Sequence, residues 1–269
     1  MTVELLSSRA GPRPVDRLAA LALAEARRLL RHPLTLLGLA AYVYSVLVSG
    51  WAPRPAFSTL TSALVLPFAV PVFFAAALVA SSSRRAGADE MLAAAPATRE
   101  QRTAAACLAA LGPFLLAGTL QAILAATYVV ADVELERFPT LYEIAAGPLC
   151  ALGAGLLGVA AARWLPWPGA STLVMLALIA VHQVLEPLHD SLAMLGFYVE
   201  FARWGHWPYQ DALGFIPGSP AWHALYLLAL SLGAGALAML RDTRRRGLWA
   251  GAGAVLAVIA VAAGVWQLP

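Results

Sequence analysis

Residues 144–165 read IAAGPLCALGAGLLGVAAARWL, and this stretch decides the class of fold. The first 19 of these residues carry no charge. That is long enough to cross a bilayer as a helix, since a span needs roughly 17–25 mainly apolar residues. Six other stretches have the same character, at 34–50, 58–82, 103–131, 170–188, 221–240 and 248–266. The sequence therefore predicts an all-α fold, a polytopic membrane helical bundle of six to seven transmembrane helices.

The composition of the whole chain supports a membrane environment. Of the 269 residues, 61% are hydrophobic and 12% are charged, and the mean hydropathy is +0.74. A soluble domain is about half apolar and a quarter charged, so this chain lacks the polar surface that a water-soluble body of its size needs. Cys107 and Cys150 both fall inside apolar runs, which predicts packing residues and neither a disulfide nor a zinc site.

Lysine is missing from the sequence, because all 18 basic residues are arginine. A Walker A loop needs its lysine on the nucleotide phosphates, and Schiff-base chemistry needs an amine. We therefore expect no catalytic residue and no bound cofactor on this chain. If the protein uses ATP, a partner chain must bind and hydrolyse it.

The arginines alternate between the two sides of the membrane in a strongly unequal way. Positive charge concentrates in cytoplasmic loops, so the side with more arginine is predicted to be cytoplasmic. It receives 15 of the 18: Arg9, Arg13, Arg17, Arg27, Arg28, Arg31, Arg84, Arg85, Arg99, Arg102, Arg163, Arg241, Arg244, Arg245 and Arg246; the other side receives Arg54, Arg137 and Arg203. This predicts a multi-pass protein of the cell (plasma or inner) membrane with a cytoplasmic N-terminus. The lipid bilayer, and no nucleic acid, is the expected surrounding of the basic residues.

Residues 1–33 are expected to form a cytoplasmic tail and an amphipathic helix. Arginines lie on the polar side of this helix and small or apolar residues on the other, a pattern suited to the membrane interface. The arginines assigned to it are Arg17, Arg27, Arg28 and Arg31. The alternative interpretation is a signal peptide with 18–24 as its short apolar region, which the arginines that follow at once disfavour.

Two spans contain residues that affect helix geometry. Pro67 and Pro71 remove backbone hydrogen bonds from the second span and predict a kink there. In the fourth span, small residues recur at four-residue intervals and allow a second helix to approach closely. They are Gly147, Ala151 and Gly155, with Gly158 beyond. Packing inside the bundle and a dimer interface are both open for them.

The connection between the second and third spans, at 84–102, reads RRAGADEMLAAAPATREQR. It predicts a short helix from about Ala88 that closes at Pro96, since a proline disfavours helix in the residue before it. Thr98 and Gln101 then predict a capping box at the start of the third span. The connection is either a loop whose arginines set topology or a surface helix that docks into a cytoplasmic partner.

Together these features resemble the permease subunit of an ABC-2 type ABC transporter. The resemblance rests on the amphipathic helix, the acidic and arginine-rich connection at 84–102 and an aromatic-rich outer segment at 191–220, and it covers about residues 15–241. It implies an elbow helix within 1–33, a permease core at 34–241 and, at 242–269, an arginine loop with an appended helix beyond the six-span family core. It also implies pairing with an ATPase subunit and with a second permease copy or a related permease, for export of a substrate. The residues implied to contact the ATPase are Arg84, Arg85, Asp89, Glu90, Met91, Leu92, Pro96 and Arg99.

Few polar residues fall within the predicted spans. Thr119 and Gln121 could line a pathway or form hydrogen bonds between packed helices. His182, Glu186 and His189 have the chemistry of zinc or copper ligands. However, a proline interrupts their helix, so no metal site is predicted there. The alternatives to a permease are a secondary transporter, a membrane scaffold or, less favoured, a membrane-embedded enzyme that uses this cluster.

Overall fold

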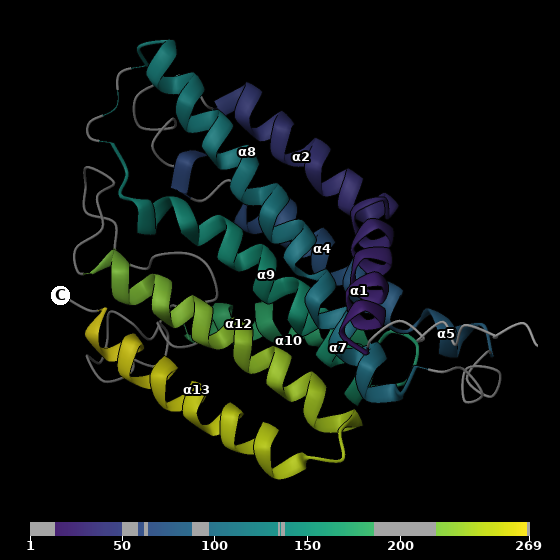
Figure 1. Cartoon of the computed structure of the whole chain (residues 1–269). Helices are drawn as coiled ribbons and strands as arrows, with labels where there is room; N and C mark the ends of the chain where they lie inside the picture. The colour runs from purple at the N-terminus through teal and green to yellow at the C-terminus, as the bar shows by residue number, and fades with distance from the viewer. Residues whose placement is uncertain are drawn as a thin grey trace, which may run out of the picture.

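The computed structural model describes residues 14–49, 59–61, 64–87, 97–133, 135, 138–185 and 219–267. Within these ranges every regular element is a helix and there is no strand, which confirms the all-α class. The helices, shown in Figure 1, are α1 Pro14–Leu30, α2 Pro33–Ser49, the π-helix η1 Val65–Ala69, α4 Val70–Ala80, α5 Ser82–Arg85, α7 Arg99–Ala109, α8 Leu111–Val130, α9 Leu141–Trp164, α10 Ala170–Leu185, α12 Pro220–Asp242 and α13 Arg246–Trp266.

Five helical segments are long and apolar enough to cross a membrane, as judged by length and composition. They are Thr59–Ala80, Arg99–Val130, Leu141–Trp164, Pro220–Asp242 and Arg246–Trp266. The other two predicted spans correspond to shorter apolar helices, α2 with 17 described residues and α10 with 16. The chain is therefore a multi-pass membrane protein, and five of the predicted spans are present as full-length helices.

Helix α9 is the centre of the bundle (Figure 1). Of its 24 residues, 16 are buried, whereas only 3 of the 21 residues of α13 are. It lies against α4, α8 and α12, and α13 packs on the far side of α12. A helix enclosed in this way must offer its neighbours a surface without long side chains, because the backbones approach closely.

The glycines of α9 provide that surface. A Cβ atom added to Gly147 would lie 2.9 Å from the Leu64 Cβ, and one added to Gly155 would lie 2.9 Å from the Ala110 Cβ. At Gly158 it would overlap the carbonyl oxygen of Phe73. The small residues of the fourth span therefore pack inside the bundle, and the dimer-interface interpretation of them is not supported.

The second span departs from α-helical geometry where its prolines predicted an interruption. The Ala69 N–H bonds the Leu64 carbonyl at 3.1 Å, five residues back, and the turn around Pro67 is a π-helix. Proline lacks the N–H of a regular helix and crowds the preceding turn, and a wider turn relieves both problems. The interrupted turn is covered by α2, where a Cβ added to Gly38 would lie 3.0 Å from the Pro71 ring.

Helix α1 packs across the end of the bundle at which α2 begins (Figure 1). Leu29 is 2% exposed and joins a cluster with two alanines of α4. Leu30 and Ala26 cover Gly112 at the start of α8. The Thr35 hydroxyl donates to the Leu29 carbonyl at 2.8 Å and closes the corner between α1 and α2. The arginines that the sequence assigns to the polar side of this helix are all exposed: Arg17, Arg27, Arg28 and Arg31.

The packing of α9 predicts different outcomes for two Gly→Ala substitutions. Gly158→Ala should lower the free energy of unfolding by about 1–3 kcal/mol, because the new methyl group meets a backbone carbonyl that cannot rotate away. The measurement is thermal or denaturant unfolding in detergent micelles.

Gly118→Ala in α8 is the matched control. Nothing lies within 4 Å of its added Cβ, so stability should stay the same or rise by up to about 1 kcal/mol from helix propensity. Equal effects of the two substitutions would contradict the close packing of α9.

Candidate functional site at the arginine-rich end

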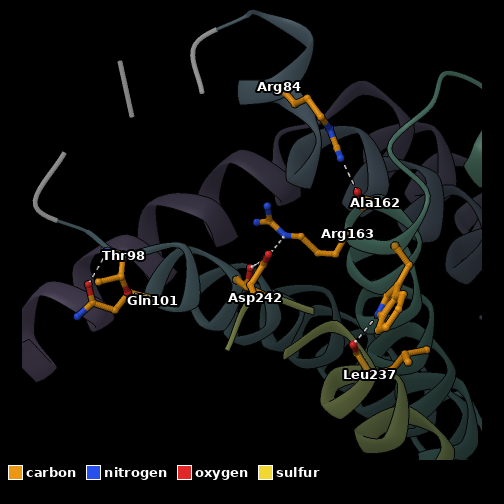
Figure 2. A network of polar contacts seen from close by, with 9 residues as sticks. Arg84, Thr98, Gln101, Ala162, Arg163, Leu237 and Asp242 are labelled. Atoms are coloured by element: carbon orange, nitrogen blue, oxygen red, sulfur yellow. Dashed lines mark hydrogen bonds and ion pairs between the residues drawn. The ribbon is translucent and has the colours of Figure 1, made fainter. Parts of the chain in front are cut away.

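The arginine-rich segments that the sequence assigns to one side of the membrane meet at one end of the bundle. In Figure 1 this end carries α1, α5, α7 and the turn between α12 and α13. Arg84 reaches the end of α9, where its guanidinium donates to the Ala162 carbonyl (Figure 2). The Arg241 guanidinium lies 5.8 Å from the ring centroid of Trp164 at the same end of α9. Segments far apart in sequence therefore form one polar surface.

Asp242 joins three helices at this end. Its Oδ2 atom accepts a hydrogen bond from the Thr103 hydroxyl at 2.6 Å, and the Arg163 Nε lies 3.5 Å from the same oxygen (Figure 2). The side chains of Arg163 and Asp242 are only 21% and 14% exposed. A charge removed from water to this extent needs its partner, so the carboxylate holds the ends of α7, α9 and α12 together.

A second contact connects Thr243, the residue after Asp242, to the start of α7. Thr243 is buried, and its hydroxyl donates to Glu100 Oε1 at 3.0 Å. The Thr243 Oγ1 atom in turn accepts the backbone N–H of Arg245 at 3.0 Å. We refer to Glu100, Thr103, Arg163, Asp242 and Thr243 as the Asp242 cluster. It fixes α7 to the last turn of α12 and to the entry of α13.

Arg84 and Arg85, two of the predicted partner-contact residues, bond within the chain. Arg84 donates to the Ala162 carbonyl of α9 and Arg85 to the Leu78 carbonyl of α4. Both acceptors are among the last four carbonyls of their helices, which have no partner inside the helix and carry the negative end of its dipole. These arginines therefore stabilise the ends of the second and fourth spans.

The predicted capping box at the start of α7 is confirmed. The Gln101 N–H donates to the Thr98 hydroxyl at 3.1 Å and the Thr98 N–H donates to Gln101 Oε1 at 3.0 Å (Figure 2). Arg99 is exposed in the first turn of this helix. The other predicted contact residues lie outside the described residues: Asp89, Glu90, Met91, Leu92 and Pro96.

His32 forms the corner between α1 and α2. Its Nδ1 atom accepts the N–H of Leu34 at 3.2 Å, which satisfies one of the free N–H groups at the start of α2. Burial, and then the positive charges of Arg85 and Arg28, lower the pKa of this imidazole below its ordinary value of 6.5. The neutral form is therefore the one that the folded protein favours.

Gln121 and Thr119, the predicted pathway residues, lie on different sides of α8. Gln121 is 1% exposed; its Oε1 accepts from the Tyr42 hydroxyl at 3.0 Å, and its amide donates to the Leu60 carbonyl. Thr119 is exposed, and its hydroxyl donates to Leu115 within the same helix at 2.8 Å. Gln121 thus forms hydrogen bonds between packed helices, and the structure does not bring the two residues together.

The predicted outer histidine and carboxylate group is only partly covered by the structure. His182 falls in α10, although the position of its side chain is not described, and Glu186 and His189 lie outside the described residues. Among the residues that are described, no three His, Cys, Asp or Glu side chains gather closely enough to hold a metal ion. The outer segment 191–220 also lies outside the described residues, apart from its last two residues.

Cys107 and Cys150 are free and pack in the interior, as predicted.

The opposite end of the bundle has a polar link of its own. His223 Nδ1 and Gln267 Oε1 are 2.8 Å apart and both side chains are buried. Gln267 also accepts the Ser219 N–H through its backbone carbonyl at 3.1 Å. The rings of Trp222 and Trp266 lie 4.7 Å apart beside it. This link fastens the end of α13 to the start of α12.

The residues of the Asp242 cluster were not among the predicted site residues. Asp242 is the single acid in the run Arg241-Asp242-Thr243-Arg244-Arg245-Arg246, and nothing within the run indicates a partner elsewhere in the chain. Its partners, Thr103 and Arg163, are 139 and 79 residues away in sequence.

Comparisons of the chain with protein-family models, with curated proteins and with solved structures each found no match. The likeness to ABC-2 permeases therefore rests on the sequence pattern.

The Asp242 cluster predicts strong coupling between Arg163 and Asp242. Asp242→Asn should lower stability by about 1–3 kcal/mol, because it weakens the bond from Thr103 and leaves the Arg163 charge without its partner. Adding Arg163→Met to that variant should restore part of the loss, since the unpaired charge is then gone. A double-mutant cycle on unfolding in detergent measures the coupling; strictly additive effects would refute it.

The corner at His32 predicts a dependence of stability on pH. Because the pKa is lower in the folded than in the unfolded state, stability is full above pH 6.5. It falls as the pH is lowered below 6.5 and levels off once the folded-state pKa is passed. His32→Asn retains an acceptor for the Leu34 N–H and does not titrate, so its melting temperature should lose this part of the pH dependence. Identical pH profiles for the two proteins would exclude the role of His32.

Proposed function

We propose that the chain is the transmembrane permease subunit of an ATP-driven ABC-2 type transporter that exports its substrate. A separate ATPase subunit supplies the energy, and a second copy or a related permease completes the pathway. The lack of lysine, the arginine-rich side and the sequence pattern of 84–102 support this assignment. The chain acts as a gate and performs no chemistry itself.

One observation carries the proposal: both ends of the connection at 84–102 are bonded to the bundle. At its beginning, Arg84 binds the last turn of α9. At its end, α7 is held to α9 and α12 through Thr103 and Asp242. A force applied to this connection therefore reaches α7, α9 and α12 through polar contacts. Such an arrangement suits a loop that receives motion from a motor subunit.

The orientation is part of the proposal. The arginine-rich end is taken as cytoplasmic because 15 of the 18 arginines fall in segments on that side. Helix α1 then lies as an interfacial elbow at the cytoplasmic face, its arginines toward headgroups and its Leu29 side against the bundle. Asp89, Glu90 and Arg99 are the residues assigned to contact the ATPase.

A charge reversal in the connection tests the contact with the ATPase. Asp89→Lys with Glu90→Lys should abolish co-purification of the ATPase subunit and substrate export, because it places like charges where complementary ones are needed. Membrane insertion and yield should not change. The measurement is the amount of ATPase recovered with the tagged chain in mild detergent, together with nucleotide hydrolysis by the recovered complex.

The matched control is Glu134→Lys with Glu136→Lys, which reverses two charges in the loop that the sequence assigns to the other side. This variant should retain the ATPase. Recovery that is unaffected by the substitutions at 89 and 90 would overturn the assigned contact. Nucleotide hydrolysis by the purified chain alone would overturn the proposed function.

A further inference from the structure

The turn between α12 and α13 exposes positive charge only. We call Arg241, Arg244, Arg245 and Arg246 the basic turn; all four are exposed. The one acid within the run, Asp242, directs its carboxylate inward to Thr103 and Arg163. Among the residues that the structure describes, none of the four arginines forms an ion pair. The charge of this turn is therefore available to an anion from outside the chain.

Aromatic and apolar residues place the basic turn at the edge of the bilayer. Trp164 and Trp167 are 41% and 46% exposed, and Leu248, two residues after the turn, is 60% exposed. Exposed tryptophans are typical of the level at which lipid headgroups begin. The Trp164 indole is held by a bond from its N–H to the Leu237 carbonyl at 2.7 Å (Figure 2), and Arg241 lies over its ring.

The surroundings of the turn favour lipid over a protein as the source of the anion. Helix α13 buries only 3 of its 21 residues, so most of its surface faces the hydrocarbon directly beside the turn. A Cβ added to Gly247 would meet nothing within 4 Å, which leaves room next to the backbone. The turn receives the negative end of the α12 dipole and the positive end of the α13 dipole, so its positive charge comes from the arginines. Basic clusters that directly adjoin a transmembrane helix attract anionic lipids.

We propose that the basic turn binds the phosphate headgroups of anionic phospholipids in the adjoining leaflet. The arginines bind the headgroup phosphate, with bidentate hydrogen bonds that a lysine could not form. The lipid thereby neutralises the turn and steadies α13, which buries only 3 of its 21 residues. This inference depends on the membrane setting of the chain and not on the proposed transport function.

Arg244→Gln, Arg245→Gln and Arg246→Gln in the full chain test the proposal. The delipidated protein is mixed with phosphatidylglycerol or phosphatidylcholine in detergent, and the melting temperature and the retained lipid are measured. Phosphatidylglycerol should raise the melting temperature of the natural protein and be retained several-fold more than phosphatidylcholine. The triple variant should lose both effects. Inorganic phosphate alone should not reproduce them, since a free anion lacks the acyl chains that lie against α13.

The matched control removes the three arginines that the sequence assigns to the other side of the membrane, with Arg54→Gln, Arg137→Gln and Arg203→Gln. It should retain the response to phosphatidylglycerol, and an equal loss in both triple variants would mean general charge attraction and overturn the site. An unchanged response in the variant of the basic turn would also overturn it.

If the triple variant does not fold, the single variants Arg244→Gln, Arg245→Gln and Arg246→Gln should each retain less phosphatidylglycerol than the natural protein, and an unchanged retention in all three would overturn the site. The salt dependence of the natural protein is measured beside them. Retention of phosphatidylglycerol should then fall with added salt while retention of phosphatidylcholine does not, because salt screens the headgroup charge only. Retention that does not depend on salt would refute the proposal.

Discussion

The close approach of α9 to its neighbours is the constraint on which the rest of the structure depends. In a bilayer, apolar side chains gain little by leaving lipid for a helix interface, so association relies on backbone proximity and on polar contacts. Gly158 lies against the Phe73 carbonyl and Gly155 against Ala110, and these contacts set the distances from α9 to the second and third spans. The other helices are arranged around this centre, from η1, which α2 covers, to the peripheral α13.

Polar groups then select one arrangement among those that the small residues permit. Gln121 has no water to bond in the interior, so it binds both the Tyr42 hydroxyl and the Leu60 carbonyl. At the arginine-rich end Asp242 does the same for α7, α9 and α12. At the other end His223 and Gln267 join α12 to α13. Each link joins residues that are 44 or more positions apart in the sequence, so together the links define which helices are neighbours.

The two ends of the bundle differ in their charge and in the polar contacts that hold the helices together. The arginine-rich end contains the Arg163–Asp242 ion pair and exposes a basic surface. In the described part of the other end, His223 lies 2.8 Å from Gln267 beside the tilted rings of Trp222 and Trp266, and Thr140 and Glu143 form a capping box at the start of α9. A partner or a lipid headgroup that carries negative charge therefore has one end to recognise. The Asp242 cluster lies directly behind that surface. A movement of α7 or of the basic turn would therefore change the hydrogen bonds and the ion pair of this cluster.

Local features of this protein were determined by the sequence alone. The apolar lengths predict the helices, Pro67 the interrupted second span, Thr98 and Gln101 the cap of α7, and the arginine pattern the division into two sides, because each depends on residues close together in the chain. Only the tertiary structure decided that the glycines of α9 face inward, that Gln121 is a bonded core residue while Thr119 is exposed, and that Asp242 meets Thr103 and Arg163. Those pairings join helices whose mutual rotation no local pattern specifies, since an apolar helix in lipid can present any face to a neighbour until packing and hydrogen bonds choose one.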